Sequence, residues 1–207
     1  MTLRHSEIEL DPGPHAYRLR GVEVPAVSNI LEAAGLCTNY DAVPAAVLEK
    51  ARRRGTAIHA AAERISRGED LGGSGEEFED YIRGYRDFVQ RVGWEAICSE
   101  IPVGHEGLLF AGTPDQVGKM TKGAACPVTI VDFKATAALD KKGTAVQLGG
   151  YAIGWDSMHP DQPIEEIAAL WLRPGDQEAR YVPLDLPLAK RVFLAAFQIW
   201  IFKHRSQ

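Results

Sequence analysis

Cysteine is scarce in this chain, which has only Cys37, Cys98 and Cys126 among its 207 residues and no Cys-x-x-Cys pair. A zinc ribbon or a four-cysteine iron–sulfur cluster within one chain is therefore excluded. The odd, sparse count also argues against a disulfide scaffold, and it predicts a reducing, cytoplasmic location.

Long hydrophobic runs are lacking as well. The longest apolar run, 192–202, is interrupted by Gln198, and it is far shorter than the roughly 20 residues that cross a bilayer. The first seven residues contain no apolar signal core. We therefore expect no membrane among the partners of this protein.

Two familiar catalytic signatures are missing. There is no Gly-x-Ser-x-Gly elbow, so a Ser–His–Asp hydrolase is poorly supported. The glycine-rich stretch 72–75 lacks the following lysine of a P-loop, so no nucleotide cofactor is expected. Positive charge is not in excess either, because 23 Lys and Arg face 28 Asp and Glu, a formal net charge of −5. This balance excludes a wholesale polycation and leaves room for a local basic face.

The composition that remains is that of a soluble globular protein, with 45% hydrophobic and 25% charged residues. The length suits one domain over residues 1–207. Within that domain we expect N-terminal strands and helices in 1–92 and a catalytic sheet core in 93–207.

Hydrophobic periodicity and turn residues predict the elements. The expected strands are Ile8–Leu10, Ala16–Arg20, Val22–Val24, Trp94–Val103, Leu108–Met120, Pro127–Thr136, Glu166–Leu172 and Ala179–Leu184. The expected helices are Val27–Ala34, Asp41–Ser66 with Pro44 in its first turn, Glu76–Val92, Thr144–Trp155 and Pro187–His204, the last apolar on nearly every face and expected to be docked. The order indicates an α/β (α+β) fold with a central mixed β-sheet flanked by helices.

The most informative segments are Pro114-Asp115 and Asp132-Phe133-Lys134. Alternate side chains of a strand share a face, so Asp132 and Lys134 point the same way and Phe133 points into the opposite layer. Asp115 lies 17 residues before Asp132 on the preceding strand, and a hairpin of that length can place the two carboxylates together. Converging carboxylates repel each other unless a divalent cation joins them, and such oxygen ligands suit Mg²⁺ or Mn²⁺. The alternative is an exposed Asp–Lys pair on an edge strand.

This arrangement resembles the PD-(D/E)xK nuclease superfamily, whose signature here reads Pro114-Asp115 and Asp132-Phe133-Lys134. The resemblance implies a restriction-endonuclease-like core and one or two Mg²⁺ or Mn²⁺ ions. It also implies that Asp115, Asp132 and the carbonyl of Phe133 bind the metal, and that Lys134 helps to activate water.

Two further segments resemble the RecB-like, phage recombination exonuclease branch of that superfamily. Arg54–Glu63 is similar to its glycine-to-histidine helix, which makes His59 a metal ligand, and Gln147–Tyr151 is similar to its Q-x-x-x-Y motif. The candidate catalytic residues are Asp115, Asp132, Lys134, Gln147 and Tyr151; the candidate metal ligands are His59, Asp115, Asp132 and Phe133; Glu63 and Glu100 are candidate indirect supports of the metal. A solvated side chain is the alternative for Glu63, and a metal-facing carboxylate or a salt bridge at the strand end is the alternative for Glu100. The adjacent glycines inside the Gln147–Tyr151 helix cost roughly 1 kcal/mol each relative to alanine, so we expect the sheet or a nucleic-acid strand to approach the backbone there.

Basic residues near these motifs are candidates for gripping DNA phosphates. They are Lys50, Arg52, Arg53, Arg54, Lys141 and Lys142. A solvated helix face is the alternative explanation for the basic run at 50–54. The tyrosines and tryptophans at 81, 85, 94 and 155 are better explained by core packing than by stacking on bases.

The resemblance implies a metal-dependent deoxyribonuclease, an exonuclease that processes DNA ends in phage or prophage recombination or repair. It would act in the cytoplasm, or in the host cytoplasm if the gene is carried by a phage. DNA is the expected partner, with a single-strand annealing protein and further copies of this chain as candidate partners. The alternatives are a structure-selective endonuclease of the same superfamily and a non-catalytic nucleic-acid-binding module with the nuclease fold.

Overall fold

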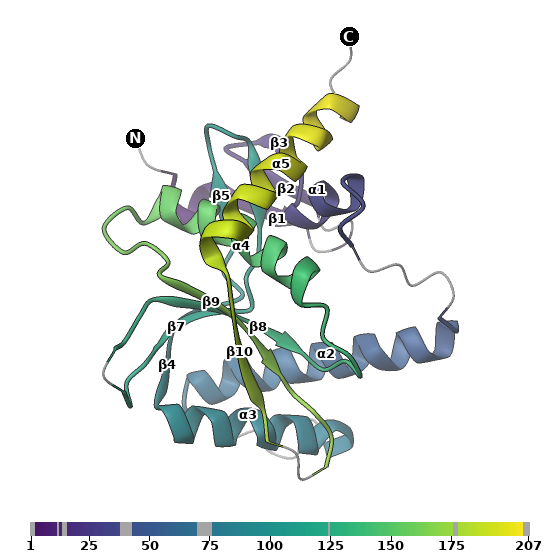
Figure 1. The fold of residues 1–207 in the computed structure, drawn as a ribbon, viewed down its shortest axis with the longest axis vertical. Helices are drawn as coiled ribbons and strands as arrows, with labels where there is room; N and C mark the ends of the chain where they lie inside the picture. The colour runs from purple at the N-terminus through teal and green to yellow at the C-terminus, as the bar shows by residue number, and fades with distance from the viewer. Residues whose placement is uncertain are drawn as a thin grey trace.

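A five-stranded mixed sheet forms the centre of the molecule (Figure 1). A computed structural model describes residues 3–11, 13, 16–37, 43–69, 76–123, 125–175 and 178–204. The strands of the central sheet, in spatial order, are β10 (Arg180–Leu184), β9 (Glu166–Trp171), β8 (Thr129–Lys134), β7 (Gln116–Met120) and β4 (Trp94–Ser99). The β8–β9 pair is parallel and the other pairs are antiparallel. The predicted α/β class with a mixed sheet is therefore confirmed.

Smaller sheets lie beside the central one. A three-stranded antiparallel sheet consists of β1 (Ile8–Asp11), β2 (Ala16–Leu19) and β3 (Val22–Val24), and it follows a short 3₁₀ helix at His5–Glu7. A two-stranded sheet pairs β5 (Val103–His105) with β6 (Phe110–Gly112). Both small sheets contribute side chains to the same apolar cluster as the helices above the central sheet, which ties them to the core.

Helices cover both faces of the central sheet (Figure 1). One face is covered by α2 (Ala45–Ser66) and α3 (Glu79–Val92), the latter preceded by a 3₁₀ turn at Glu76–Phe78. The other face is covered by α4 (Lys141–Met158), which packs against α5 (Leu186–His204) and α1 (Val27–Ala33). Successive residues of β8 serve the two faces in turn, since Ile130 joins the α4 side and Val131 joins the α2–α3 side. No helix in the described part of the chain is both long and apolar enough to span a membrane.

Two predicted strands were wrong in length because the backbone breaks within them. The expected strand 94–103 is interrupted at Glu100, which has a φ of +50°, and at Pro102, which has no N–H for a ladder. The expected strand 108–120 is interrupted at 113–115, where Pro114 has the same effect. These two breaks split each expected strand into one part in the central sheet and one part in the β5–β6 sheet.

Several helix limits also differ from the predictions. The expected helix 144–155 begins earlier, because Asp140 caps it by accepting a hydrogen bond from the backbone N–H of Gly143. Pro44 lies at the N-cap of α2 instead of in its first turn, and the predicted start at Asp41 lies outside the described residues. The expected loop at 67–75 is described only to Glu69, and one residue of the expected turn 174–176, Asp176, also lies outside the described residues.

The paired glycines of α4 serve a helix contact and not the sheet or a nucleic-acid strand. A Cβ at Gly149 would lie 2.5 Å from the backbone carbon of Ala189, and one at Gly150 would lie 2.6 Å from the ring of Phe193. Both neighbours belong to α5, so the prediction of a close approach was right and its expected partner was wrong. The docking of α5 is one-sided, because its outer face exposes Leu188, Leu194, Ile199 and Phe202.

Candidate functional site

Asp115 and Asp132 lie side by side where β7 and β8 diverge. The last residue pair of these antiparallel strands is Gln116 with Val131, so the next step places Asp115 opposite Asp132. Beyond that step β8 has no partner strand on its β7 side, and the backbone N–H of Phe133 donates a hydrogen bond of 2.6 Å to Asp115 Oδ2. The predicted meeting of the two aspartates across the hairpin is therefore present in the structure.

Burial and like charge act together on this pair. Asp132 is only 3% exposed, and the side chain of Asp115 is 13% exposed. Burial, followed by the negative charge of Asp132, raises the pKa of Asp115 above its ordinary value, although His59, the Phe133 N–H and Lys134 oppose that rise. An ionised carboxylate at position 115 is thus held in an unfavourable place when no other cation is present.

Lys134 provides a positive charge on the same face of β8. Its Nζ atom lies 2.7 Å from Asp132 Oδ2, as the alternation along the strand predicts. That same Oδ2 atom is buried and accepts no hydrogen bond within the described residues. The neighbours in sequence, Val131 and Phe133, pack in the opposite layer among residues of α2 and α3. The alternative of an exposed Asp–Lys pair on an edge strand is excluded by burial, since Asp132 is 3% exposed and β9 pairs with β8 along its whole length.

His59 approaches the aspartates from α2. Its Nε2 atom lies 3.6 Å from Asp115 Oδ2, and its Nδ1 atom lies 2.7 Å from Glu100 Oε1. Burial by itself lowers the pKa of this imidazole, but Asp115 and Glu100 outweigh burial and raise the pKa to about 9. The hydrogen bond from His59 in turn lowers the pKa of Glu100. Glu100 thus binds the nitrogen of His59 that faces away from Asp115, and its role as an indirect support of a metal stays a prediction.

Gln147 and Tyr151 form one unit on α4. The Gln147 Nε2 atom donates a hydrogen bond of 2.8 Å to the Tyr151 hydroxyl, which is what their spacing of one helical turn allows. Burial raises the pKa of Tyr151, and the charges of Asp132 and Asp115 add to that rise. The tyrosine is thus a neutral group close to both carboxylates, and its ring packs against Gly112.

The donor set can be compared with the needs of a divalent cation. Within the ranges that the structure describes, no group of three or more His, Cys, Asp or Glu side chains is arranged to hold a metal ion as it stands. Asp115 Oδ2 is occupied by the Phe133 N–H, and His59 Nδ1 is occupied by Glu100. The chemistry of the set still fits, because two buried carboxylates repel each other and the Lys134 ammonium is the one polar partner of Asp132 Oδ2 among the described residues. The metal ligands His59, Asp115, Asp132 and Phe133 therefore stay a prediction.

Several predicted residues are not part of this cluster. Glu63 forms an ion pair of 2.6 Å with Arg67 at the C-terminal end of α2. Arg53 forms an ion pair with Glu77, and the guanidinium of Arg54 lies 5.3 Å from the centre of the Tyr81 ring. Lys50 and Arg52 are exposed on α2, and Lys141 and Lys142 are exposed in the first turn of α4. Tyr85, Trp94 and Trp155 are buried, as core packing predicts.

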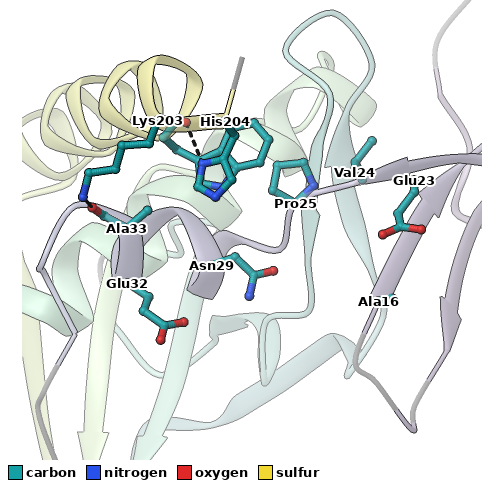
Figure 2. A pocket seen from close by; sticks show the side chains of 10 residues that line it. Ala16, Glu23, Val24, Pro25, Asn29, Glu32, Ala33, Lys203 and His204 are labelled. Carbon is teal, nitrogen blue, oxygen red and sulfur yellow. Dashed lines mark hydrogen bonds between the residues drawn. The ribbon is translucent and has the colours of Figure 1, made fainter. Parts of the chain in front are cut away.

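One cavity borders on the cluster, and a second lies elsewhere on the molecule. A cavity of about 480 Å³ is lined by Lys134 and Gln147, by Leu31 of α1 and by residues of the chain between β8 and α4, so the cluster borders on open space. A second cavity of about 770 Å³ lies between α1, β3 and the C-terminal end of α5 (Figure 2). Its lining includes Glu23, Asn29, Glu32 and Lys203, and it contains none of the predicted site residues.

Gln116 is a polar residue of this region to which the sequence reasoning gave no role. It is 1% exposed, and its amide contacts residues of α2, α3 and β4. The available signal was a lone amide beside Val117 at the start of a buried strand, where an unpaired polar group is costly.

Comparisons with known proteins give structural similarities only. No family model matches the chain, and no curated protein is similar to it in sequence. The crystal structure of SSO0001 is similar with 11% identity and a TM-score of 0.38, over 87% of this chain and 85% of that one. LHK-Exo in complex with dAMP is similar with 10% identity and a TM-score of 0.39, over 87% and 90% of the two chains. The alkaline exonuclease LHK-Exo from Laribacter hongkongensis is similar with 11% identity and a TM-score of 0.34, over 86% and 90%. At these values the similarity assigns no activity to this chain.

Proposed function

We propose that this chain is a metal-dependent deoxyribonuclease of the PD-(D/E)xK type, an exonuclease acting at DNA ends in phage or prophage recombination or repair. The observation that supports the proposal is the convergence of Asp115, Asp132 and Lys134 where β7 and β8 diverge. Two repelling carboxylates with an ammonium group beside them are costly for the fold, and binding a cation to hydrolyse a phosphodiester would account for them.

Each side chain has a role that its position allows. Asp115 and Asp132 would hold Mg²⁺ or Mn²⁺ with His59 and the Phe133 carbonyl, and a bound ion of this kind lowers the pKa of water and neutralises charge on phosphate. Lys134, 2.7 Å from Asp132, would orient the attacking water and stabilise negative charge that develops on the phosphate. Glu100 keeps the His59 ring in place through Nδ1.

The helix α4 would position the DNA strand. The Nε2 atom of Gln147 donates a hydrogen bond to Tyr151. Its Oε1 atom would accept a hydrogen bond from the substrate at the edge of the cavity that Lys134 also lines. Lys141 and Lys142 are exposed in the first turn of the same helix and would contact the phosphate backbone. On α2, Lys50 and Arg52 are the better candidates for this role, since Arg53 and Arg54 already contact Glu77 and Tyr81.

The test is digestion of end-labelled linear and circular DNA with Mg²⁺ and with Mn²⁺. Lys134→Ala is the variant, and Lys119→Ala, in the same sheet on β7 and outside the cluster, is the matched control. We expect the wild type and Lys119→Ala to degrade linear DNA. Lys134→Ala should be slower by a factor on the order of 10² or more, the usual cost of removing one group that stabilises the transition state.

Other outcomes identify the alternatives. Circular DNA cut as readily as linear DNA would indicate an endonuclease. DNA binding that survives Asp115→Asn, without cleavage by the wild type, would indicate a non-catalytic binding module. The absence of cleavage of every DNA substrate with both metals would refute the proposal.

A further inference from the structure

We propose that Gln116 is a positioning residue that holds Asp115, His59 and Glu100 in their mutual arrangement. The inference rests on the proposed nuclease function. Gln116 is the first residue of β7 and follows Asp115 directly in the chain. Its side chain does not face the cluster of carboxylates, because it turns into the layer of α2 and α3 and is 1% exposed.

The amide of Gln116 uses both of its ends. Its Oε1 atom accepts hydrogen bonds of 2.9 Å from the Tyr85 hydroxyl on α3 and of 2.9 Å from the Trp94 indole on β4. Its Nε2 atom donates to Ser99 Oγ at 3.0 Å and, at a longer 3.5 Å, to the carbonyl of Ala62 on α2. A buried amide with acceptor and donor both satisfied is a specific choice, because ionised glutamate has no donor, and methionine has no donor and only a weak acceptor.

The donor end of the amide leads to the segments that carry the site. Ala62 lies about one helical turn after His59 on α2. Ser99 precedes Glu100, whose strained φ of +50° turns its side chain out of the strand and whose backbone N–H donates to the Asp115 carbonyl at 3.0 Å. Gln116 therefore joins α2, the end of β4 and the start of β7 at the point where each presents one site residue.

The acceptor end contacts α3 through the Tyr85 hydroxyl. Helix α3 carries none of the candidate catalytic or metal-binding residues, although the Tyr85 ring packs against that of Phe133, with 5.2 Å between the ring centroids. Tyr85→Phe keeps this ring contact and removes only the hydroxyl. The two ends of the Gln116 side chain thus offer a comparison between a hydrogen bond to the segment that carries Glu100 and a hydrogen bond to α3. Displacements of about 1 Å in catalytic groups can cost on the order of 10² in rate, so the difference should be measurable.

The experiment compares Ser99→Ala with Tyr85→Phe, and adds Gln116→Met, which keeps the side-chain length and loses every hydrogen bond. We expect Ser99→Ala to lower kcat about 10-fold and Gln116→Met to lower it about 100-fold, with KM for DNA unchanged. Tyr85→Phe should keep kcat within about 2-fold, although it lowers Tm as Ser99→Ala does. Binding of Mn²⁺, measured by calorimetry without DNA, should weaken in Ser99→Ala and Gln116→Met and not in Tyr85→Phe.

A purely structural role for Gln116 would give a different pattern. In that case Ser99→Ala and Tyr85→Phe would change kcat and Mn²⁺ affinity equally, or Gln116→Met would lower Tm alone, and either result overturns the inference. If Gln116→Met does not fold, the comparison of Ser99→Ala with Tyr85→Phe still decides, although Ser99→Ala also removes a longer contact of 3.4 Å with Ser66 Oγ. If the wild type neither binds Mn²⁺ nor cleaves DNA, the proposed function fails and this inference fails with it. If the wild type does both, the variants test the role of Gln116 alone.

Discussion

Ionised Asp115 is expected to lower the free energy of unfolding of the metal-free protein. Burial and the charge of Asp132 raise its pKa despite the attraction of His59, so ionised Asp115 is unfavourable in the folded state. Asp115→Asn keeps an oxygen for the Phe133 N–H and offers Asp132 a donor. We expect this variant to raise the free energy of unfolding by about 1 to 2 kcal/mol in urea titrations with EDTA at neutral pH. A variant less stable than the wild type would contradict the unfavourable pairing.

The raised pKa of Asp115 also determines how the folding stability changes with pH. The folded protein binds the Asp115 proton more tightly than the unfolded chain does. In the unfolded chain this carboxyl has its ordinary pKa of 3.8. The stability from this group is therefore complete below pH 3.8 and is lost as the pH rises through the higher value of the folded protein. The urea midpoint of Asp115→Asn should fall less than that of the wild type over this range. If the urea midpoints of the two proteins change in parallel with pH, Asp115 does not contribute to the pH dependence of stability.

Residue by residue, the sequence predicts local relations and misses distant ones. Asp115, Asp132 and Lys134 could be placed because alternation along a strand and a hairpin of 17 residues involve neighbouring chain only. The role of Gln116 depends on Ala62, Tyr85 and Trp94, which lie 22 to 54 residues away in the sequence. No short-range pattern carries such information, because those partners meet only when α2 and α3 dock on the sheet.

At the scale of elements, the contact between α4 and α5 depends on the absence of a side chain at Gly149. A methyl group there would lie 2.5 Å from the backbone carbon of Ala189 and 2.6 Å from its oxygen, and backbone atoms of a packed helix cannot move aside cheaply. We expect Gly149→Ala to destabilise the protein by about 1 to 3 kcal/mol in spite of the better helix propensity of alanine. The measurement is a urea titration followed by circular dichroism.

Gly55 on α2 supplies the matched control for that substitution. It is also a glycine inside a helix, but a Cβ built on it meets nothing within 4 Å. Gly55→Ala should therefore raise the stability by about 0.5 to 1 kcal/mol, the usual gain from replacing a helical glycine. Two substitutions of the same sign and size would mean that α4 and α5 do not approach as closely as the structure indicates.

Elements were predicted well where periodicity alone defines them and less well where the backbone changes direction. The glycine pair in α4 indicated a close neighbour, yet only the tertiary structure identifies that neighbour as α5. The breaks at Glu100 and at 113–115 were missed for a related reason. A positive φ is uncommon for a residue other than glycine, so the sequence does not predict it at a glutamate. Here the side chain of Glu100 contacts His59.

For the molecule as a whole, the central sheet carries a separate apolar cluster on each face. Trp155 lies in the cluster of α1, α4 and α5, while Trp94 lies in the cluster of α2 and α3. Strand β8 contributes Ile130 to the first and Val131 to the second, so neither cluster can lose this strand without affecting the other. Each cluster contains residues of both predicted parts of the domain, 1–92 and 93–207.

A single cooperative domain over residues 1–207 requires both clusters to unfold together. We expect fluorine NMR of protein labelled with 5-fluorotryptophan to show the same urea midpoint and the same slope for Trp94 and Trp155, because shared strands couple the two faces. All four tryptophan signals come from one sample, and Trp→Phe variants assign them. Separate midpoints would mean that one layer of helices leaves the sheet before the other. In that case Asp115 and Asp132 would lose either His59 from α2 or Tyr151 from α4 first, and the order of loss would show which layer of helices is the less stable one.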